Sequence, residues 1–255
     1  MSLCSIPPFY LRGSYLKKIV WCLLWLPGVV QAQSDTYNTY EIWTRLMFQK
    51  ELSPRWEVMG GVNYRRQNNF LEQRENPFLF PQAYLYRLSV NYRTKKDFTF
   101  YLSPLLYADN FRLEFTDANR NQVIAVKQRE IRFTIGGSQV FTINKLQLRP
   151  RLLYEYRHFL ETRPQSRVRL QLHFQHPLYK PAEGQTLSLM AFHEVFYNIT
   201  TLRSLFFDQN RSFLGLFYQT GKTFEYQLGY QYTYQKQASF VLHRSQILLH
   251  ANVRL

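Results

Sequence analysis

The chain has 255 residues, with 32 Lys and Arg against 17 Asp and Glu, a net charge of +15, 45% hydrophobic residues and 17% aromatic residues. A mean hydropathy of −0.36 and the lack of an uncharged apolar run of ~18–20 residues exclude a bundle of transmembrane helices. The apolar and aromatic content excludes a disordered chain, and two cysteines are too few for a disulfide scaffold. What remains is one domain or two, rich in residues that strands prefer.

The N-terminus has the features of a secretory signal peptide, which we place at residues 1–32. Arg12, Lys17 and Lys18 precede the apolar stretch Ile19–Val30, and Ala32 ends a cleavage site of small residues. A membrane anchor is the alternative, but this apolar stretch is too short to cross a bilayer. We therefore expect an exported protein.

Cleavage after the leader leaves a single domain, residues 33–255, with its net charge lowered to +12 because three Lys and Arg are removed. Both cysteines, Cys4 and Cys22, are removed with it. The remaining domain has no cysteine, so it can form neither a disulfide nor a thiol site.

Along this domain, apolar and polar residues alternate, which gives a strand one apolar and one polar face. The clearest example has apolar residues at every second position: Phe224, Tyr226, Leu228, Tyr230, Tyr232 and Tyr234. Eleven segments show the pattern, at residues 38–50, 56–66, 82–93, 98–109, 122–140, 146–159, 166–176, 185–198, 209–219, 224–235 and 240–255.

The segments have about the 9–11 residues that a tilted membrane strand needs, and short and long connections alternate between them. We therefore predict an all-β fold, an antiparallel up-and-down transmembrane barrel with short periplasmic turns and longer outer loops. Because bacterial barrels have an even number of strands, we expect 10–12, with 12 favoured over the eleven segments. A soluble β-sandwich or lipocalin-like barrel also alternates and is the main alternative.

A pair of segments resembles a known family. His193–Asn198 reads His-Glu-Val-Phe-Tyr-Asn, and Phe207–Arg211 reads Phe-Asp-Gln-Asn-Arg. They are similar to the domain of unknown function 2490 family, whose members are predicted outer-membrane barrels of Gram-negative bacteria. The resemblance covers about residues 38–255 and implies fold and location, because the family has no assigned activity. One departure from the usual barrel pattern is the last residue, Leu255, where such barrels end in an aromatic.

The polar faces of the predicted strands carry many charges, which would line a barrel lumen. This predicted charge ladder consists of Arg65, Arg87, Arg132, Arg149, Arg151, Glu155, Arg157, Arg167, Arg169, Glu194 and Glu225. In a narrow barrel such side chains can fill and brace the interior. The alternative is that they attract anions into a low-dielectric channel.

The family motif flanks one long loop, so we expect its polar residues to converge at the outer rim. They would form either a hydrogen-bond network between strands or a site for a cation or lipid head group. The motif residues are Glu194, Phe196, Asn198, Asp208, Gln209, Asn210 and Arg211.

For function, the sequence favours a structural or lipid-interacting barrel, with a small anion-leaning channel as the alternative. A lipid hydrolase or acyltransferase is a remote third possibility, because His193-Glu194 and His243–Ser245 supply suitable residue types without a spacing that defines a triad. We expect no enzyme activity, metal, cofactor or nucleic acid. The expected partners are outer-membrane lipid, lipopolysaccharide at Arg66, Arg74, Arg120 and Lys127, and the barrel assembly machinery. The protein is expected to be a monomer.

Overall fold

The computed structural model describes residues 35–71, 76–116, 122–199, 207–237 and 240–255. The predicted leader, residues 1–32, lies outside them. Within these residues the only regular elements are strands, and no helix is long and apolar enough to cross a membrane.

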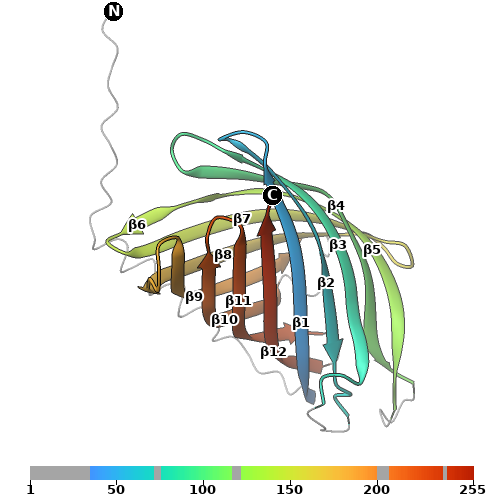
Figure 1. Ribbon diagram of the computed structural model, residues 1–255. Helices are drawn as coiled ribbons and strands as arrows, with labels where there is room; N and C mark the ends of the chain where they lie inside the picture. Colours follow the sequence, from blue (N-terminus) through green and yellow to red (C-terminus); the bar gives the residue numbers. More distant parts are fainter. Residues whose placement is uncertain (1–34, 72–75, 117–121, 200–206, 238–239) are drawn as a thin grey trace, which may run out of the picture. The chain divides into compact units, whose positions relative to one another are not determined.

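The strands form one closed sheet (Figure 1). Their bounds are β1 Asp35–Glu51, β2 Trp56–Gln67, β3 Phe80–Arg93, β4 Phe98–Phe115, β5 Val123–Gln139, β6 Phe141–Ile143, β7 Leu146–Phe159, β8 Gln165–Tyr179, β9 Gln185–Asn198, β10 Phe207–Thr220, β11 Phe224–Lys236 and β12 Phe240–Arg254. Each of the eleven alternating segments of the sequence coincides with one long strand. The twelfth, β6, has three residues and pairs with β7 just beyond the end of β5, which also pairs with β7.

The wall of the barrel is therefore eleven long strands plus a short piece, and this number decides how it closes. Consecutive long strands are antiparallel. With an odd number of long strands, the first and last must run in the same direction, and β1 indeed pairs with β12 in parallel, from Asp35 opposite Phe240 to Gln49 opposite Arg254. The predicted antiparallel arrangement thus holds everywhere except at this closing pair.

The two ends of the barrel differ. One end carries the tight connections, such as those between β1 and β2 and between β10 and β11, and we call it the turn end. The other carries the three longest connections, those of β2–β3, β4–β5 and β9–β10, together with the short β11–β12 connection, and is called the loop end. In Figure 1 the last strand finishes at the turn end, beside the label of the C-terminus, whereas β1 begins at the loop end. The prediction of short turns opposite long loops is therefore met.

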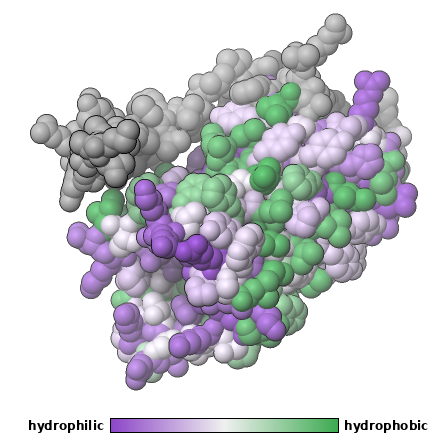
Figure 2. All heavy atoms as spheres, turned by 90° about the horizontal axis from the view of Figure 1, so that it is seen from above, coloured by the Kyte–Doolittle hydropathy of each residue, from purple (hydrophilic) through white to green (hydrophobic). Residues whose placement is uncertain are grey.

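Apolar side chains cover the outside of the wall. On β11, Tyr226, Leu228 and Tyr230 are each about half exposed, and Ile247 and Leu249 of neighbouring β12 are similar. In Figure 2 green and pale side chains cover much of the visible surface, while purple ones lie mainly along its edges, at the left, below and at the upper right. A contiguous exposed apolar surface of this kind is typical of a protein that contacts lipid.

The polar faces of the strands turn inward. Inward residues include fully buried charged and amide side chains, namely Glu41, Glu130, Glu155, Glu194, Gln231 and Gln246. The interior also contains a small apolar cluster formed by Trp43, Met190, Phe213 and Leu248. Apolar outside and polar inside is the reverse of a soluble β-barrel, and it follows directly from the alternation in the sequence.

Candidate functional site

The barrel encloses a cavity of about 610 Å³ that runs from the loop end to the middle of the lumen. Two carboxylates, Glu194 and Asp208, are on its lining. Eleven arginines line it: Arg45, Arg65, Arg87, Arg112, Arg132, Arg151, Arg157, Arg167, Arg169, Arg211 and Arg244. Three further glutamates, which are completely buried behind this lining, also bind arginines, and the exposed Glu114 pairs with Arg112, so six carboxylates face the eleven guanidinium groups.

One part of the wall is neutralised by a continuous chain of ion pairs. Arg132 of β5 donates from Nε to Glu130 at 2.7 Å and from Nη1 to Glu155 of β7 at 3.4 Å. Arg169 of β8 then joins Glu155, at 2.6 Å, to Glu194 of β9, at 2.5 Å. We call these residues, with those that extend them, the carboxylate network.

Three more residues extend the network towards the loop end. Arg157 donates two hydrogen bonds to Glu130, of 2.8 and 2.9 Å. Arg167 binds Glu155 at 2.5 Å and reaches Asp208, at the start of β10, at 3.0 Å. The network thus connects β5, β7, β8, β9 and β10, and it satisfies buried carboxylates that would be costly to leave unpaired.

Phe196 lies at the centre of the family motif and has no exposed surface. Three guanidinium groups lie near its ring, those of Arg211 at 4.5 Å, Arg167 at 4.6 Å and Arg169 at 4.8 Å. Arg211 also lies opposite Glu194 in the register of β9 and β10, with a longer contact of 3.8 Å. The ring face attracts cations, so Phe196 holds three like charges together in a small space.

Another part of the wall has arginines without carboxylate partners. Among the described residues, no carboxylate lies within ion-pair distance of Arg45, Arg65, Arg87 or Arg151, which we call the unpaired arginine cluster. Arg45 donates to Asn63 at 2.6 Å, and the other contacts are with aromatic rings. The Nε atoms of Arg65 and Arg87 are buried without a hydrogen-bond partner.

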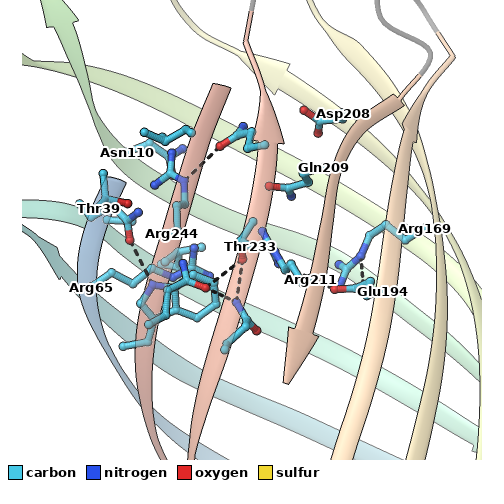
Figure 3. Close-up of a pocket in the computed structure, with 18 of the residues that line it drawn as sticks. Thr39, Arg65, Asn110, Arg169, Glu194, Asp208, Gln209, Arg211, Thr233 and Arg244 are labelled. Carbon is cyan, nitrogen blue, oxygen red and sulfur yellow. Dashed lines mark hydrogen bonds and ion pairs between the residues drawn. The ribbon is translucent and has the colours of Figure 1, made fainter. Parts of the chain in front are cut away.

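These unpaired arginines also act on one another. Arg87 and Arg151 are both near enough to Arg45 to repel it electrostatically, and Arg211 is near enough to Arg65. Figure 3 shows Arg65, Arg211 and Arg244 pointing into the interior, with Arg169 and Glu194 paired on the adjacent wall. Clustered like charges within a low-dielectric wall produce a strong field that favours an anion.

The parallel seam between β1 and β12 has its own buried carboxylate. Glu41 accepts a hydrogen bond from Arg244 at 2.6 Å and another from Gln246 at 2.5 Å, both across the seam. On its own strand it accepts from the indole of Trp43 at 2.9 Å and from Thr39 at 3.3 Å. Side chains therefore tie together the two strands that close the barrel.

Most of the predicted charge ladder lies on this lumen surface, but two members do not reach the cavity. Arg149 is exposed near the turn end. Glu225 lies at the same end, where it accepts from Asn252 at 3.1 Å and pairs with Arg254. The remaining ladder residues line the cavity or, like Glu155, bind the arginines that do.

The family motif converges at the loop half of β9 and β10, as its position around one long connection indicated. Gln209 faces Phe196 in the register, and Arg211 faces Glu194. Asn210 is paired with Val195. It lies between Gln209 and Arg211 on the strand, so alternation turns its side chain away from the lumen. Asn198 lines the cavity, and its side-chain oxygen is buried with no partner. The motif thus supplies carboxylates and aromatic surface to the arginines.

Two residues proposed for the outer rim are described. Arg66 bonds to Tyr64 at 2.9 Å and to the carbonyl of Phe78, and Lys127 pairs with Asp109 at 3.0 Å. Arg74 and Arg120 lie outside the described residues. Another rim pair joins Arg129 to Glu161, at 2.7 Å, and this hydrogen bond lowers the pKa of the Glu161 carboxyl below its ordinary value.

Two histidines considered for catalysis lie on the outside of the wall. His193 Nδ1 is 2.9 Å from Ser212 Oγ, and His243 contacts the hydroxyl of Tyr232. Among the described residues neither histidine is bonded to a carboxylate. The same residues contain no group of three or more His, Cys, Asp or Glu side chains that could hold a metal ion. A serine and a histidine meet here, but not in a complete triad.

Glu41 and its partners Trp43 and Gln246 were not among the site residues predicted from the sequence. The signal was present, because Glu41, Trp43 and Arg45 occupy every second position of the first strand. Alternation could not predict that the last strand lies beside the first in parallel register, with Gln246 opposite Glu41.

Comparison with solved structures shows weak similarity to two membrane-associated proteins. The β domain of the Bordetella autotransporter BrkA is 12% identical, with 76% of this chain and 82% of that chain covered at a TM-score of 0.43. Outer-membrane expressed OmpT of Vibrio cholerae is 11% identical, with 71% and 55% covered at a TM-score of 0.35. No curated protein matches the chain. Residues 40–244 match the family described as protein of unknown function (DUF2490), and the chain belongs to that family.

Proposed function

We propose that the protein is an outer-membrane β-barrel of a Gram-negative bacterium whose lumen binds anions. The membrane part of this proposal is supported by the exposed apolar wall and the inward polar faces. The leader predicted at residues 1–32 supports export. The short turns would lie in the periplasm and the loop end would face outward, where Arg66 and Lys127 could meet lipopolysaccharide phosphates.

One observation carries the anion-binding part: eleven arginines surround a 610 Å³ cavity and exceed the carboxylates that could neutralise them. The carboxylate network neutralises some of these arginines, which therefore need no ligand. It leaves the unpaired arginine cluster, in which the buried Nε atoms of Arg65 and Arg87 have no acceptor. A bound anion would supply those acceptors, and hydrogen bonds to charged groups are among the stronger ones.

This proposal combines two interpretations that the sequence left open. The carboxylate network braces one side of the lumen, which is the structural role, and the unpaired cluster gives the remaining space a preference for anions. We assign no enzymatic activity to the His193–Ser212 contact, since an attacking serine needs a base that is itself oriented by a third group. We propose a monomer that the barrel assembly machinery inserts, because the closed wall has no free sheet edge.

Titration calorimetry on the detergent-solubilised protein tests the proposal, with inorganic phosphate as the probe. We expect binding by the wild type and about tenfold weaker binding by the double variant R65Q/R87Q, which removes charge without breaking an ion pair. The matched control is R129Q, which removes an exposed arginine of the same barrel paired with Glu161. Equal phosphate binding by the wild type and R65Q/R87Q would refute the proposal.

Planar-bilayer recording addresses whether bound anions also pass through. A discrete conductance with a reversal potential shifted towards that of chloride would extend the proposal from a binding barrel to a channel. The absence of any conductance over a range of salt concentrations would end the channel interpretation and leave the binding site to be judged by calorimetry.

A further inference from the structure

An apolar surface lies inside the barrel, in the same cavity as the arginines. Trp43 of β1, Met190 of β9 and Leu248 of β12 form a buried cluster with Phe213, and all three also line the cavity. Phe192, stacked on Phe213 with ring centroids 5.0 Å apart, is a further lining residue. Lumen-facing positions of a membrane barrel are ordinarily polar, so these four apolar lining residues depart from the pattern.

The apolar surface is in contact with two of the arginines that line the cavity. The guanidinium carbon of Arg65 lies 3.5 Å from the ring centroid of Trp43, and that of Arg211 lies 5.5 Å from it. The Nε atoms of both arginines are buried without a partner. Arg45 follows Trp43 at the next inward position of the same strand. A molecule held by these guanidinium groups would therefore rest against carbon surface as well.

We propose that the lumen site takes an organic anion, a molecule with a phosphate or carboxylate group attached to an apolar or aromatic body. This inference rests on the proposed anion-binding function and specifies its ligand class. Arg65 and Arg211 would hold the acidic group through their unpaired Nε donors, while Trp43, Met190 and Phe192 would contact the apolar body. The cavity volume lies within the range of ordinary small-molecule sites, which is about 300–1,000 Å³.

The charge and the apolar surface together exclude other ligand classes. A cation would meet eleven arginines, with six carboxylates already bound to them. A small inorganic anion would satisfy the guanidinium groups but place nothing against the apolar lining, whereas an apolar body set against that lining would leave water itself, which is favourable by about 25 cal/mol per Å². An anion with an apolar body satisfies both surfaces at once.

Two phosphate monoesters that share a charged group but differ in their apolar body test this inference. We expect phenyl phosphate to bind the solubilised full chain about tenfold or more tightly than methyl phosphate in calorimetry, because the ring adds buried apolar area. Phenyl phosphate should also change the fluorescence of Trp43, and the change should be missing in W43F but present in W56F, since Trp56 lies exposed at the turn end.

Matched substitutions locate the effect. M190Q places a polar group of similar size in the lumen surface and should reduce the preference for phenyl phosphate while leaving methyl phosphate binding unchanged. M47Q is its control, because Met47 is as buried as Met190 but does not line the cavity. R65Q/R87Q should weaken both esters, which would separate binding in the lumen from partition into detergent.

The outcomes distinguish this inference from the proposed function. If both esters bind with equal affinity and R65Q/R87Q weakens both, the anion site stands and the organic-anion inference is overturned. If neither ester nor inorganic phosphate binds, the proposed function itself fails. A preference for phenyl phosphate that M190Q leaves unchanged would also overturn the inference, because the apolar body would then lie elsewhere.

Discussion

Glu155 has no exposed surface and accepts hydrogen bonds from three arginines on the two strands beside its own, Arg132 of β5 and Arg167 and Arg169 of β8. In the carboxylate network Glu130, Glu155 and Glu194 are each shared by two or more arginines, and Arg132, Arg167 and Arg169 each bridge two carboxylates. Sharing matters because an isolated buried charge is expensive, whereas a fully bonded group is tolerated. The same rule makes single substitutions in the carboxylate network more damaging than the strength of any one pair suggests.

We therefore expect Glu155→Gln to destabilise the barrel strongly. The amide removes the negative charge and leaves Arg132, Arg167 and Arg169 confronting one another, and removing one partner of a buried pair costs about 3–5 kcal/mol. Denaturant unfolding in detergent measures the loss. The control is Glu161→Gln, whose carboxylate is exposed on the rim, so its substitution should change the stability far less than that of Glu155. Similar losses for the two variants would contradict the prediction.

At the scale of the elements, the parallel pair β1–β12 is the join on which closure depends. Its backbone register runs over fifteen residue pairs, and its inward side chains place Glu41 against Arg244 and Gln246. Parallel pairing is slightly less stable per residue than antiparallel pairing. A buried, charge-assisted contact across this join compensates where the sheet is otherwise weakest.

Glu41→Gln should consequently open the barrel more easily than a change elsewhere on β1. The substitution leaves Arg244 without its carboxylate. When samples are heated to increasing temperatures before electrophoresis, we expect the folded band to convert to the unfolded band at a lower temperature than in the wild type. Glu51→Gln is the control, because Glu51 is exposed at the end of the same strand. An unchanged transition in Glu41→Gln would show that the seam does not depend on this ion pair.

Gly229 allows β10 and β11 to approach closely beneath the ring of Phe213. A Cβ at Gly229 would lie 2.4 Å from Phe213 Cζ and 2.6 Å from the carbonyl oxygen of Leu214. Gly229→Ala should therefore cost about 1–3 kcal/mol through overpacking, measured by denaturant unfolding. Gly60→Ala, whose Cβ would be 3.8 Å from its nearest neighbour, should be tolerated. Equal stability of the two variants would contradict this packing.

The elements are also where sequence reasoning was most successful, for a physical reason. A strand with one face in lipid and one in a polar lumen must alternate, so the period alone located all eleven long strands. The end of a strand is less constrained, because residues beyond the bilayer need not alternate. β4 consequently continues to Phe115, through residues interpreted as loop after position 109.

The site was only partly predictable because alternation assigns a side chain to a face but not to a partner. It placed Arg87 and Glu155 on the same polar face, yet Glu155 lies in a dense network and Arg87 has no carboxylate partner among the described residues. That difference comes from the register between paired strands, which alternation along one strand does not determine. Trp43 and Met190 were likewise not predicted to face the lumen, because the inward face of a strand was identified by its polar residues and these two are apolar.

On the scale of the whole molecule, an odd number of long strands separates the two ends of the folded chain. β1 begins at the loop end and β12 finishes at the turn end, where the amide of Leu255 donates to the carbonyl of Gln49 at 2.8 Å. In a barrel with an even number of strands, both ends would lie on one side of the membrane. The parallel closure therefore predicts that the start of β1 and the end of β12 lie on opposite sides of the membrane, which can be tested in cells.

Single cysteines provide that test, because the domain after the leader contains none. Asn38→Cys lies at the start of β1, Thr162→Cys in the connection between β7 and β8 at the loop end, and Lys222→Cys in the turn between β10 and β11. With a membrane-impermeant maleimide on intact cells, we expect Asn38→Cys to label like Thr162→Cys and unlike Lys222→Cys, whichever end faces outward. The unsubstituted protein controls for Cys4 and Cys22. Labelling of Asn38→Cys that follows Lys222→Cys instead would require an even-stranded barrel, and with it an antiparallel partner for β1 in place of β12.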